Sequence, residues 1–195
     1  RMKIKQLYGV LLHRPNQLMG QFGLALYEAL LNIKSLGLAS KIGVSIYETT
    51  ELDVLLEFYH FDIIQAPLNI LDRRILESGW ASQLHNAGVE LHTRSVFLQG
   101  LLLMTPSQRP IKFQRWNETW STWDSWINRE GLTRVQACLR FAANLSTIKR
   151  VIVGVDSITQ LNQILEAVDG KLTNLPDFDS LKDLRLINPA SWSQL

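Results

Sequence analysis

Short apolar runs alternate with amphipathic helical patterns along most of the chain. Residues 7–13 form an apolar run that ends at Arg14-Pro15, a pattern typical of a strand buried on both faces. Apolar residues then recur at helical spacing over residues 26–33, and Gly37 stands where a glycine commonly ends a helix. These two segments predict one βα unit.

The same alternation continues toward the C-terminus. Runs of the same kind predict further strands at residues 41–46, 63–67, 89–95 and 150–154. A capping box at residues 50–53 is expected to open the second helix. The third helix is expected to end near Gly88 and to carry Leu76, Trp80, Leu84 and Ala87. The last strand is followed by a helix on positions 158, 161, 165 and 168.

A Trp-rich excursion at residues 105–128 interrupts this alternation before a helical stretch at residues 132–145. Within it, Trp116, Trp120 and Trp123 recur at helical spacing. We expect these rings to pack against the rest of the fold, with a substrate lid or a dimer interface as the alternative. A C-terminal tail is predicted at residues 170–195, with helical character around residues 179–184.

Composition excludes several classes of protein. The 195 residues are 46% hydrophobic and 19% charged, which is typical of one globular domain. The net charge of +2 is small and its basic residues are scattered, so nucleic acid is not an expected partner. No apolar run approaches the roughly 20 residues that cross a bilayer, so we expect no membrane association and a cytoplasmic location. The only cysteine, Cys138, lies in an apolar stretch and is interpreted as a buried side chain, and the scattered histidines predict no metal site.

Polar side chains follow the ends of successive predicted strands. In parallel βα folds, whether an open sheet or part of a barrel, function gathers at the carboxyl ends of the strands. Polar groups are costly to bury without partners, so a set of them at one edge suggests a ligand. The residues at these ends are His13, Ser45, Gln65, Arg94 with Ser95, and Gly154 with Ser157.

Five segments in this order resemble strands four to eight of the aldo-keto reductases: residues 11–15, 41–45, 62–69, 94–102 and 152–161. The resemblance implies an α/β fold of the TIM-type (β/α)8 barrel class, of which this chain carries roughly the last five βα units. Residues 1–195 would then form one partial barrel domain.

The resemblance also implies an activity. Members of the family reduce aldehydes or ketones, or oxidise alcohols, with NADP(H) and sometimes NAD(H) bound without a Rossmann domain. Their catalysis uses a tyrosine as general acid, a lysine, an aspartate and a histidine that orients the substrate carbonyl. Only the histidine has a counterpart here, His13, so the chain alone is expected to be inactive. Tyr8 and Tyr47 fall in no segment that resembles the tyrosine's loop, and neither is assigned.

The cofactor residues implied by the resemblance fall into three groups. Ser45 and Gln65 match side chains that contact the nicotinamide carboxamide, and Arg94 stands where a ring commonly stacks on the nicotinamide. A second group matches the loop along the pyrophosphate: Ser95, Phe97, Gln99 and Gly100. A third would face the adenosine half: Gly154, Ser157, Gln160 and Gln163. A simple capping box between Ser157 and Gln160 is the alternative for the last group.

Three departures from the family pattern, Ile46, Asp156 and Ile164, leave the choice between NADP(H) and NAD(H) open. The implied substrate is a small carbonyl or alcohol compound. The implied partner is a missing N-terminal barrel segment or a second copy of the chain, because a partial barrel leaves strand edges unpaired. A longer native chain is favoured over a deliberate truncation or a natural fragment. A non-catalytic barrel module like the channel-associated β subunits of this superfamily is the alternative function.

Overall fold

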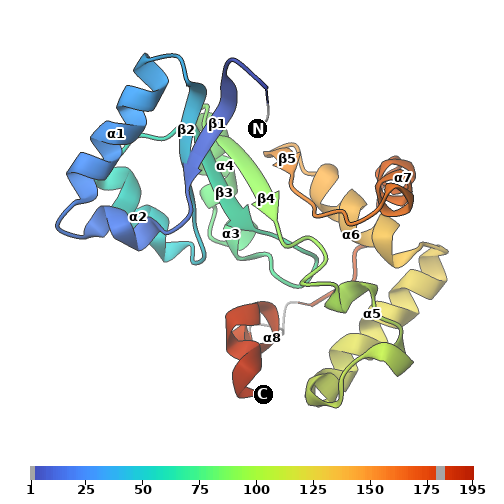
Figure 1. Ribbon diagram of the computed structural model, residues 1–195. Helices are drawn as coiled ribbons and strands as arrows, with labels where there is room; N and C mark the ends of the chain where they lie inside the picture. Colours follow the sequence, from blue (N-terminus) through green and yellow to red (C-terminus); the bar gives the residue numbers. More distant parts are fainter. Residues whose placement is uncertain (1–2, 179–182) are drawn as a thin grey trace. The chain divides into compact units, whose positions relative to one another are not determined.

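The computed structural model describes residues 3–178 and 183–195. Its described part contains a five-stranded sheet in which consecutive strands are neighbours. The strands are β1 (Leu7–Leu12), β2 (Ala39–Ser45), β3 (Ile63–Pro67), β4 (Glu90–Arg94) and β5 (Ile148–Val151). The first four pair in parallel, which confirms the predicted βα architecture (Figure 1).

The chain divides into two compact units. The sheet unit comprises residues 1–67, 74–94 and 147–150, and the helical unit comprises residues 68–73, 95–146 and 151–195.

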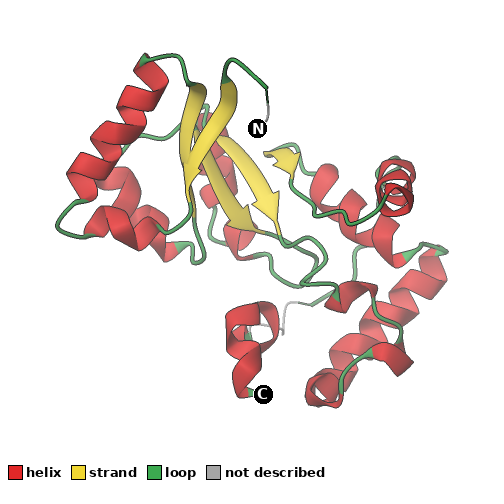
Figure 2. Ribbon diagram, viewed as in Figure 1, coloured by secondary structure: helices red, strands yellow, loops and turns green. Residues whose placement is uncertain are grey.

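Four helices accompany the strands of the sheet unit among the described residues: α1 (Gly23–Ser35), α2 (Thr50–Phe58), α3 (Arg74–Glu77) and α4 (Trp80–Asn86). A 3₁₀ turn at Pro15–Met19 joins β1 to α1. Figure 2 shows α1 and α2 side by side along one flank of the sheet. The core between strands and helices is aliphatic, with Ile42, Val44, Leu52, Leu55, Ile64 and Leu84 almost completely buried. Burial of these side chains supplies the main driving force for packing the helices on the strands.

Gly43 sets the close approach of β2 and β3. It pairs with Ile63 in the parallel register, and a Cβ on Gly43 would lie 2.3 Å from the Ile63 carbonyl oxygen. Any side chain here would push the two strands apart. Because β2 and β3 end in Ser45 and Gln65, this glycine also brings those two side chains together.

Two predictions for the helices of the sheet unit need correction. The capping box at residues 50–53 was wrong, because no side chain caps the start of α2 at Thr49. Glu51 instead accepts hydrogen bonds from the backbone N–H groups of Tyr47 and Glu48, at 2.7 and 3.0 Å. The third predicted helix is two helices, because Gly79 adopts a φ of 80° between α3 and α4. That left-handed conformation interrupts a helix.

The fifth strand also differs from its prediction. It was expected at residues 150–154, whereas β5 spans Ile148–Val151. The apolar residues Ile152 and Val153 therefore follow the strand, and Gly154 lies three residues beyond its end.

The helical unit contains the helices α5 (Asn117–Glu130), α6 (Arg134–Ala143), α7 (Ile158–Ala167) and α8 (Leu184–Ile187) among its described residues. Shorter 3₁₀ turns occupy Leu101–Leu103, Pro106–Gln108, Ile111–Trp116 and Pro189–Gln194. The part of the predicted C-terminal helical segment at residues 179–182 lies outside the described residues. Within the described ranges, no helix is long and apolar enough to cross a bilayer.

Tryptophans form the centre of the helical unit. Trp116, Trp120, Trp123 and Trp126 are all buried, and the rings of Trp123 and Trp126 stack with centroids 5.5 Å apart. Three of their indole N–H groups donate to backbone carbonyls, those of Phe113, Leu102 and Asn174. Satisfying each indole nitrogen removes the cost of burying a polar group. These rings therefore serve as core of this unit.

The apolar positions of α7 are exposed, unlike the buried tryptophans. Ile158, Leu161 and Leu165 recur at helical spacing as predicted, but Ile158 is 79% exposed and Leu165 is 59% exposed. Of the residues of α7, only Ala167 is buried. This face is apolar surface that the described residues leave open to solvent.

Candidate functional site

The carboxyl ends of β1 to β4 bring together the four predicted site residues of the sheet unit. His13 follows β1, Ser45 ends β2, Gln65 lies in β3 and Arg94 ends β4. The register pairs Ser45 with Gln65 and Pro67 with Arg94, so these ends lie at one edge of the parallel sheet. The sequence predicted that these four residues lie at this edge.

Ser45 lies at the centre of this group. Its hydroxyl donates to Gln65 Oε1 at 3.0 Å and accepts from Arg94 Nε at 3.4 Å. The Arg94 Nη2 group also donates to the Ile46 carbonyl at 3.0 Å. Ser45 is buried, so these bonds meet the requirement that a buried hydroxyl find partners.

Tyr47 extends the group to His13. The Tyr47 hydroxyl lies 3.1 Å from His13 Nε2, and the two rings meet edge to face with centroids 6.0 Å apart. The Arg94 guanidinium lies over the Tyr47 ring, 4.5 Å from its centroid. Such a cation over an aromatic face is attracted by the ring quadrupole. One continuous set of contacts therefore runs from His13 through Tyr47 and Arg94 to Ser45 and Gln65.

The sequence argument left Tyr47 unassigned. A usable signal was its spacing, because Tyr47 follows Ser45 by two residues and residues two apart share a face of an extended chain. Ile46 between them is 1% exposed, whereas Tyr47 is 39% exposed. The apolar residue points into the core and the phenol does not.

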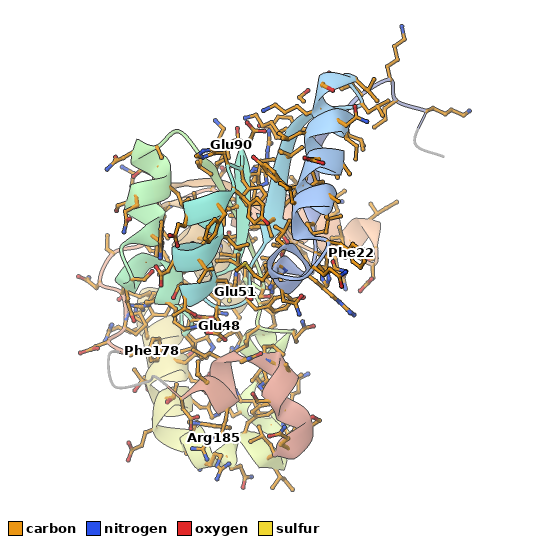
Figure 3. All side chains as sticks on the ribbon, turned by 90° about the vertical axis from the view of Figure 1, so that its left-hand side faces the viewer. Phe22, Glu48, Glu51, Glu90, Phe178 and Arg185 are labelled. Carbon is orange, nitrogen blue, oxygen red and sulfur yellow. The ribbon has the colours of Figure 1, made fainter. Side chains whose placement is uncertain are left out.

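Acidic side chains hold the segment that carries Tyr47. The Glu51 carboxylate accepts from the Tyr47 backbone N–H at 2.7 Å, and Glu48 forms an ion pair with Arg74. Figure 3 shows Glu48 and Glu51 toward one end of the sheet unit and Glu90 toward the other. Glu51 thereby links the start of α2 to the backbone of the site.

A second polar cluster surrounds Glu90, the first residue of β4. Tyr8 donates its hydroxyl to Glu90 at 2.6 Å, Lys41 forms an ion pair with it, and His92 Nε2 lies 2.9 Å from it. Burial alone would raise the pKa of Glu90, but the hydrogen bonds from Lys41, Tyr8 and His92 outweigh it and lower the pKa to about 2. The hydrogen bond with Glu90 raises the pKa of Lys41. Because this cluster lies at the amino end of the sheet, its contribution is to stability.

The predicted pyrophosphate loop lies in the helical unit and has an unusual backbone. Ser95, Leu98 and Gln99 have φ values of 64°, 47° and 53°, and Gly100 has a φ of 83°. Residues other than glycine rarely adopt this left-handed region, and where they do the strain commonly marks a ligand site. Ser95, Gln99 and Gly100 of the predicted set share this conformation, and Phe97 lies between them.

Asn69 supports this loop. Its side-chain N–H donates to the Ser95 carbonyl at 3.2 Å, while its Oδ1 accepts from the backbone N–H groups of Leu71 and Asp72. Asn69 is 1% exposed, so all these bonds are shielded from water. Asn69 lies in the segment 62–69 that resembles strand six of the family, but the sequence alone indicated no role for it.

The third predicted group lies around the start of α7, in the helical unit. The Ser157 hydroxyl accepts from the Gln160 backbone N–H at 3.2 Å, and Gln160 Oε1 accepts from the Asp156 backbone N–H at 2.8 Å. This is one half of a capping box, with the return bond made to Asp156 in place of Ser157. Gly154, Ser157, Gln160 and Gln163 are all exposed, so each is accessible to a ligand.

Cys138 is buried, and burial raises the pKa of its thiol, so the thiol has no role as a nucleophile. Among residues 3–178 and 183–195, no three His, Cys, Asp or Glu side chains are grouped so that they could hold a metal ion.

A parallel βα fold with polar strand ends defines a class of proteins that bind ligands at the carboxyl edge of the sheet. The family model for the aldo/keto reductase family matches residues 1–183, and the chain therefore belongs to that family. This confirms the predicted resemblance, and with it the α/β fold class of a partial TIM-type barrel.

Solved structures share the fold. The aldo-keto reductase AKR11C1 from Bacillus halodurans, in its holo form, is 21% identical with a TM-score of 0.64, over 87% of this chain and 58% of that one. An aldo/keto reductase from Klebsiella pneumoniae, in complex with NADP and acetate, is 19% identical with a TM-score of 0.63, over 95% and 60%. The chain thus spans less than two thirds of these relatives. No curated protein matched the sequence.

Proposed function

We propose that this chain supplies the histidine and much of the cofactor site of an NADP(H)-dependent oxidoreductase that reduces an aldehyde or ketone. The observation that carries the proposal is the set of contacts joining His13, Tyr47, Arg94, Ser45 and Gln65 at the carboxyl edge of the sheet. The Klebsiella relative, which is in complex with NADP, supports the same choice of cofactor.

The side chains present fit a nicotinamide. Ser45 and Gln65 offer a hydroxyl and an amide, the donor and acceptor types that pair with a carboxamide. They are 3.0 Å from each other, so a carboxamide would exchange bonds with a pair already aligned. Arg94 presents a planar guanidinium, which stacks on rings. When bound, the cofactor supplies the hydride.

His13 would act on the substrate. A neutral imidazole can donate a hydrogen bond to the carbonyl oxygen, where negative charge grows as the carbonyl is reduced. The nitrogen that contacts Tyr47 is Nε2, so Tyr47 holds the imidazole in one orientation before a substrate arrives. Positioning of this kind lowers the cost of reaching the transition state.

The rest of the catalytic set is proposed to come from outside these 195 residues. The chain contains no counterpart of the family's general-acid tyrosine with its lysine and aspartate partners. We therefore expect the chain alone to bind a nicotinamide nucleotide without turning over a carbonyl substrate. A protein that binds cofactor without useful turnover even with its full barrel is the alternative, and a turnover assay separates the two.

The proposed partner is a further barrel segment, with a second copy of this chain as the alternative. Two features support an added segment: the chain spans 58% of its Bacillus relative, and the apolar face of α7 is exposed at Ile158, Leu161 and Leu165. Large exposed apolar patches commonly mark an interaction surface. The mass of the particle in solution, measured by light scattering, distinguishes a monomer from a self-associated form.

The proposed location of the protein is the cytoplasm.

The test is a fluorescence titration with NADPH and with NADH. We expect saturable binding, weakened by Ser45→Ala, while the control Ser35→Ala, at the end of α1, leaves it unchanged. Absence of any signal with either nucleotide, for a protein shown to be folded, would refute the proposal. The ratio of the two affinities then determines which cofactor is preferred.

A further inference from the structure

A cavity of about 390 Å³ lies within the helical unit, outside every residue assigned to the cofactor or the substrate. Its wall is built by the 3₁₀ turns at 106–108 and 111–116 together with the first half of α5. The lining residues are Pro106, Arg109, Phe113, Gln114, Asn117, Trp120, Ser121 and Asp124. This volume lies in the range of small-molecule sites.

Two arginines share one carboxylate at this cavity. Arg109 donates to Asp124 through both Nη1, at 2.7 Å, and Nη2, and Arg134 Nη2 donates to the same Asp124. The side chain of Arg109 is 7% exposed, that of Asp124 is 18% exposed and that of Arg134 is 20% exposed. One carboxylate neutralises only one of the two guanidinium groups, so the cluster carries a net charge of +1 in a shielded place. A buried charge in excess is costly unless an opposite charge approaches.

Arg109 is fixed in place at the cavity wall. It is held by its two bonds to Asp124, by the Met104 carbonyl at 3.3 Å and by the Trp120 ring, 4.7 Å away. Its Nε and that of Arg134 are buried and find no hydrogen-bond acceptor among the described residues, so neither is reached from the cavity. What Arg109 offers a ligand is therefore a rigidly placed positive charge.

The other polar groups on the wall are mostly neutral. Gln114, Asn117 and Ser121 are exposed and offer amide and hydroxyl donors. Asn117 is also the first residue of the 14-residue helix α5, whose amino end attracts negative charge. Glu118, in the same turn, is exposed and is not among the lining residues. Asp124 is the only acidic lining residue, and its carboxylate is engaged by both arginines.

We propose that this cavity binds the oxyanion of a small molecule, a carboxylate or a phosphate group. The anion would accept from the side chains of Asn117 and Ser121 beside the Arg109 guanidinium, and it would neutralise the excess positive charge. The site does not depend on the nicotinamide cofactor, because its lining residues and the predicted cofactor residues have no member in common.

The test uses the full chain without any nicotinamide nucleotide, so its result is separate from the proposed function. Inorganic phosphate and succinate are titrated in parallel, to distinguish the two sources of the oxyanion. The ¹⁵N-bound protons of Arg109 Nε and of the Trp120 indole report binding, and the Trp80 indole of the sheet unit is the internal reference. We expect saturable shifts at Arg109 and Trp120, none at Trp80, and none with potassium chloride at matched ionic strength.

Matched variants on α5 locate the site. Ser121→Ala and Asn117→Ala, both exposed, are each expected to weaken binding about tenfold, the loss of one hydrogen bond to a charged group. Ser125→Ala, one turn further along α5 and outside the lining residues, should bind as the unchanged protein does. Arg109→Met, which removes the excess positive charge, should abolish binding, and the Ser121 and Asn117 variants test the proposal if that variant does not fold. The proposal is overturned if neither anion gives a saturable shift, if chloride reproduces the shift, or if Ser125→Ala weakens binding as much as Ser121→Ala.

Discussion

The hydroxyl of Tyr47 lies 3.1 Å from Nε2 of His13. A phenol hydroxyl can either donate to an imidazole nitrogen or accept from it, so this contact fixes the orientation of the ring whichever nitrogen carries the proton. Under the proposed function, His13 would donate to the substrate oxygen, where charge grows, and its orientation decides whether it can reach that oxygen. We therefore propose Tyr47 as a positioning residue for His13.

Replacing Tyr47 with phenylalanine should release the His13 ring. A hydrogen bond of ordinary net strength, about 1 kcal/mol, corresponds to about a fivefold change in the ratio of rings held in this orientation to rings in other orientations. The loss of the hydrogen bond is measured from the ¹⁵N chemical shift of His13 Nε2. Tyr8→Phe, which removes a hydroxyl that contacts Glu90, should leave the His13 shifts unchanged. Identical His13 shifts in the Tyr47→Phe variant and the unchanged protein would contradict the assignment.

Arg94→Lys should weaken NADPH binding about tenfold. A lysine keeps the positive charge but loses the planar group that lies over Tyr47 and donates to Ser45 and the Ile46 carbonyl. The loss of the proposed stacking of the guanidinium on the nicotinamide corresponds to that factor. Arg14→Lys, at an exposed position, is the control for a general effect of the exchange. Equal affinities of the Arg94→Lys variant and the unchanged protein would show that Arg94 does not contribute to the cofactor site.

Glu90 should make stability depend on pH in the acid range. Its pKa in the folded chain is about 2, below the ordinary value of 4.5, so the unfolded chain binds a proton more readily than the folded one. The stabilisation is complete above about pH 5 and is lost as the pH falls toward 2, with a slope of at most about 1.4 kcal/mol per pH unit. Urea unfolding at pH 7, 4 and 3 measures it.

The matched variant for this pH dependence is Glu90→Gln. It removes the titrating group, so the free energy of unfolding should be lower at pH 7 and should fall less between pH 5 and pH 3. Asp183, whose pKa the Arg185 side chain lowers to about 2, contributes in the same direction, and Asp183→Asn isolates its share. If Glu90→Gln loses as much stability on acidification as the unchanged protein does, Glu90 is not the responsible group.

β1 to β3 could be predicted because each contains a short apolar run, although β1 is only partly buried. β1 to β4 each begin and end within two residues of their predictions. The fifth strand could not be placed in this way, since β5 contains the exposed residues Lys149 and Arg150. The apolar residues that suggested a strand there lie just beyond it. Helical periodicity predicted α7 correctly, but periodicity does not say what covers an apolar face, and Leu165 is exposed.

The site could be predicted where a strand end fixes a side chain. His13, Ser45, Gln65 and Arg94 were found because parallel strands bring their carboxyl ends to one edge. Tyr47 was left unassigned because it falls in no segment that resembles the loop of the family's tyrosine, and its contact with His13 joins residues 34 apart in the sequence. The Arg109–Asp124–Arg134 cluster was missed because Arg109 follows the 3₁₀ turn at Pro106–Gln108 while the other two residues come from two helices, and no single period relates the three.

Asp124→Asn should destabilise the helical unit strongly. The amide cannot neutralise either guanidinium, so Arg109 and Arg134 would remain largely buried without a counter-charge, a change that costs about 3 kcal/mol or more. The free energy of unfolding in urea measures the loss, followed by the indole fluorescence of the buried tryptophans. Asp156→Asn, at an exposed position before α7, is the control and should change stability by less than about 0.5 kcal/mol. An anion bound in the cavity would neutralise the arginines in place of the Asp124 carboxylate. Added phosphate or succinate should therefore stabilise the Asp124→Asn variant more than it stabilises the unchanged protein. A small loss of stability, comparable with that of the control, would mean that water reaches the cluster and that the two arginines do not need Asp124.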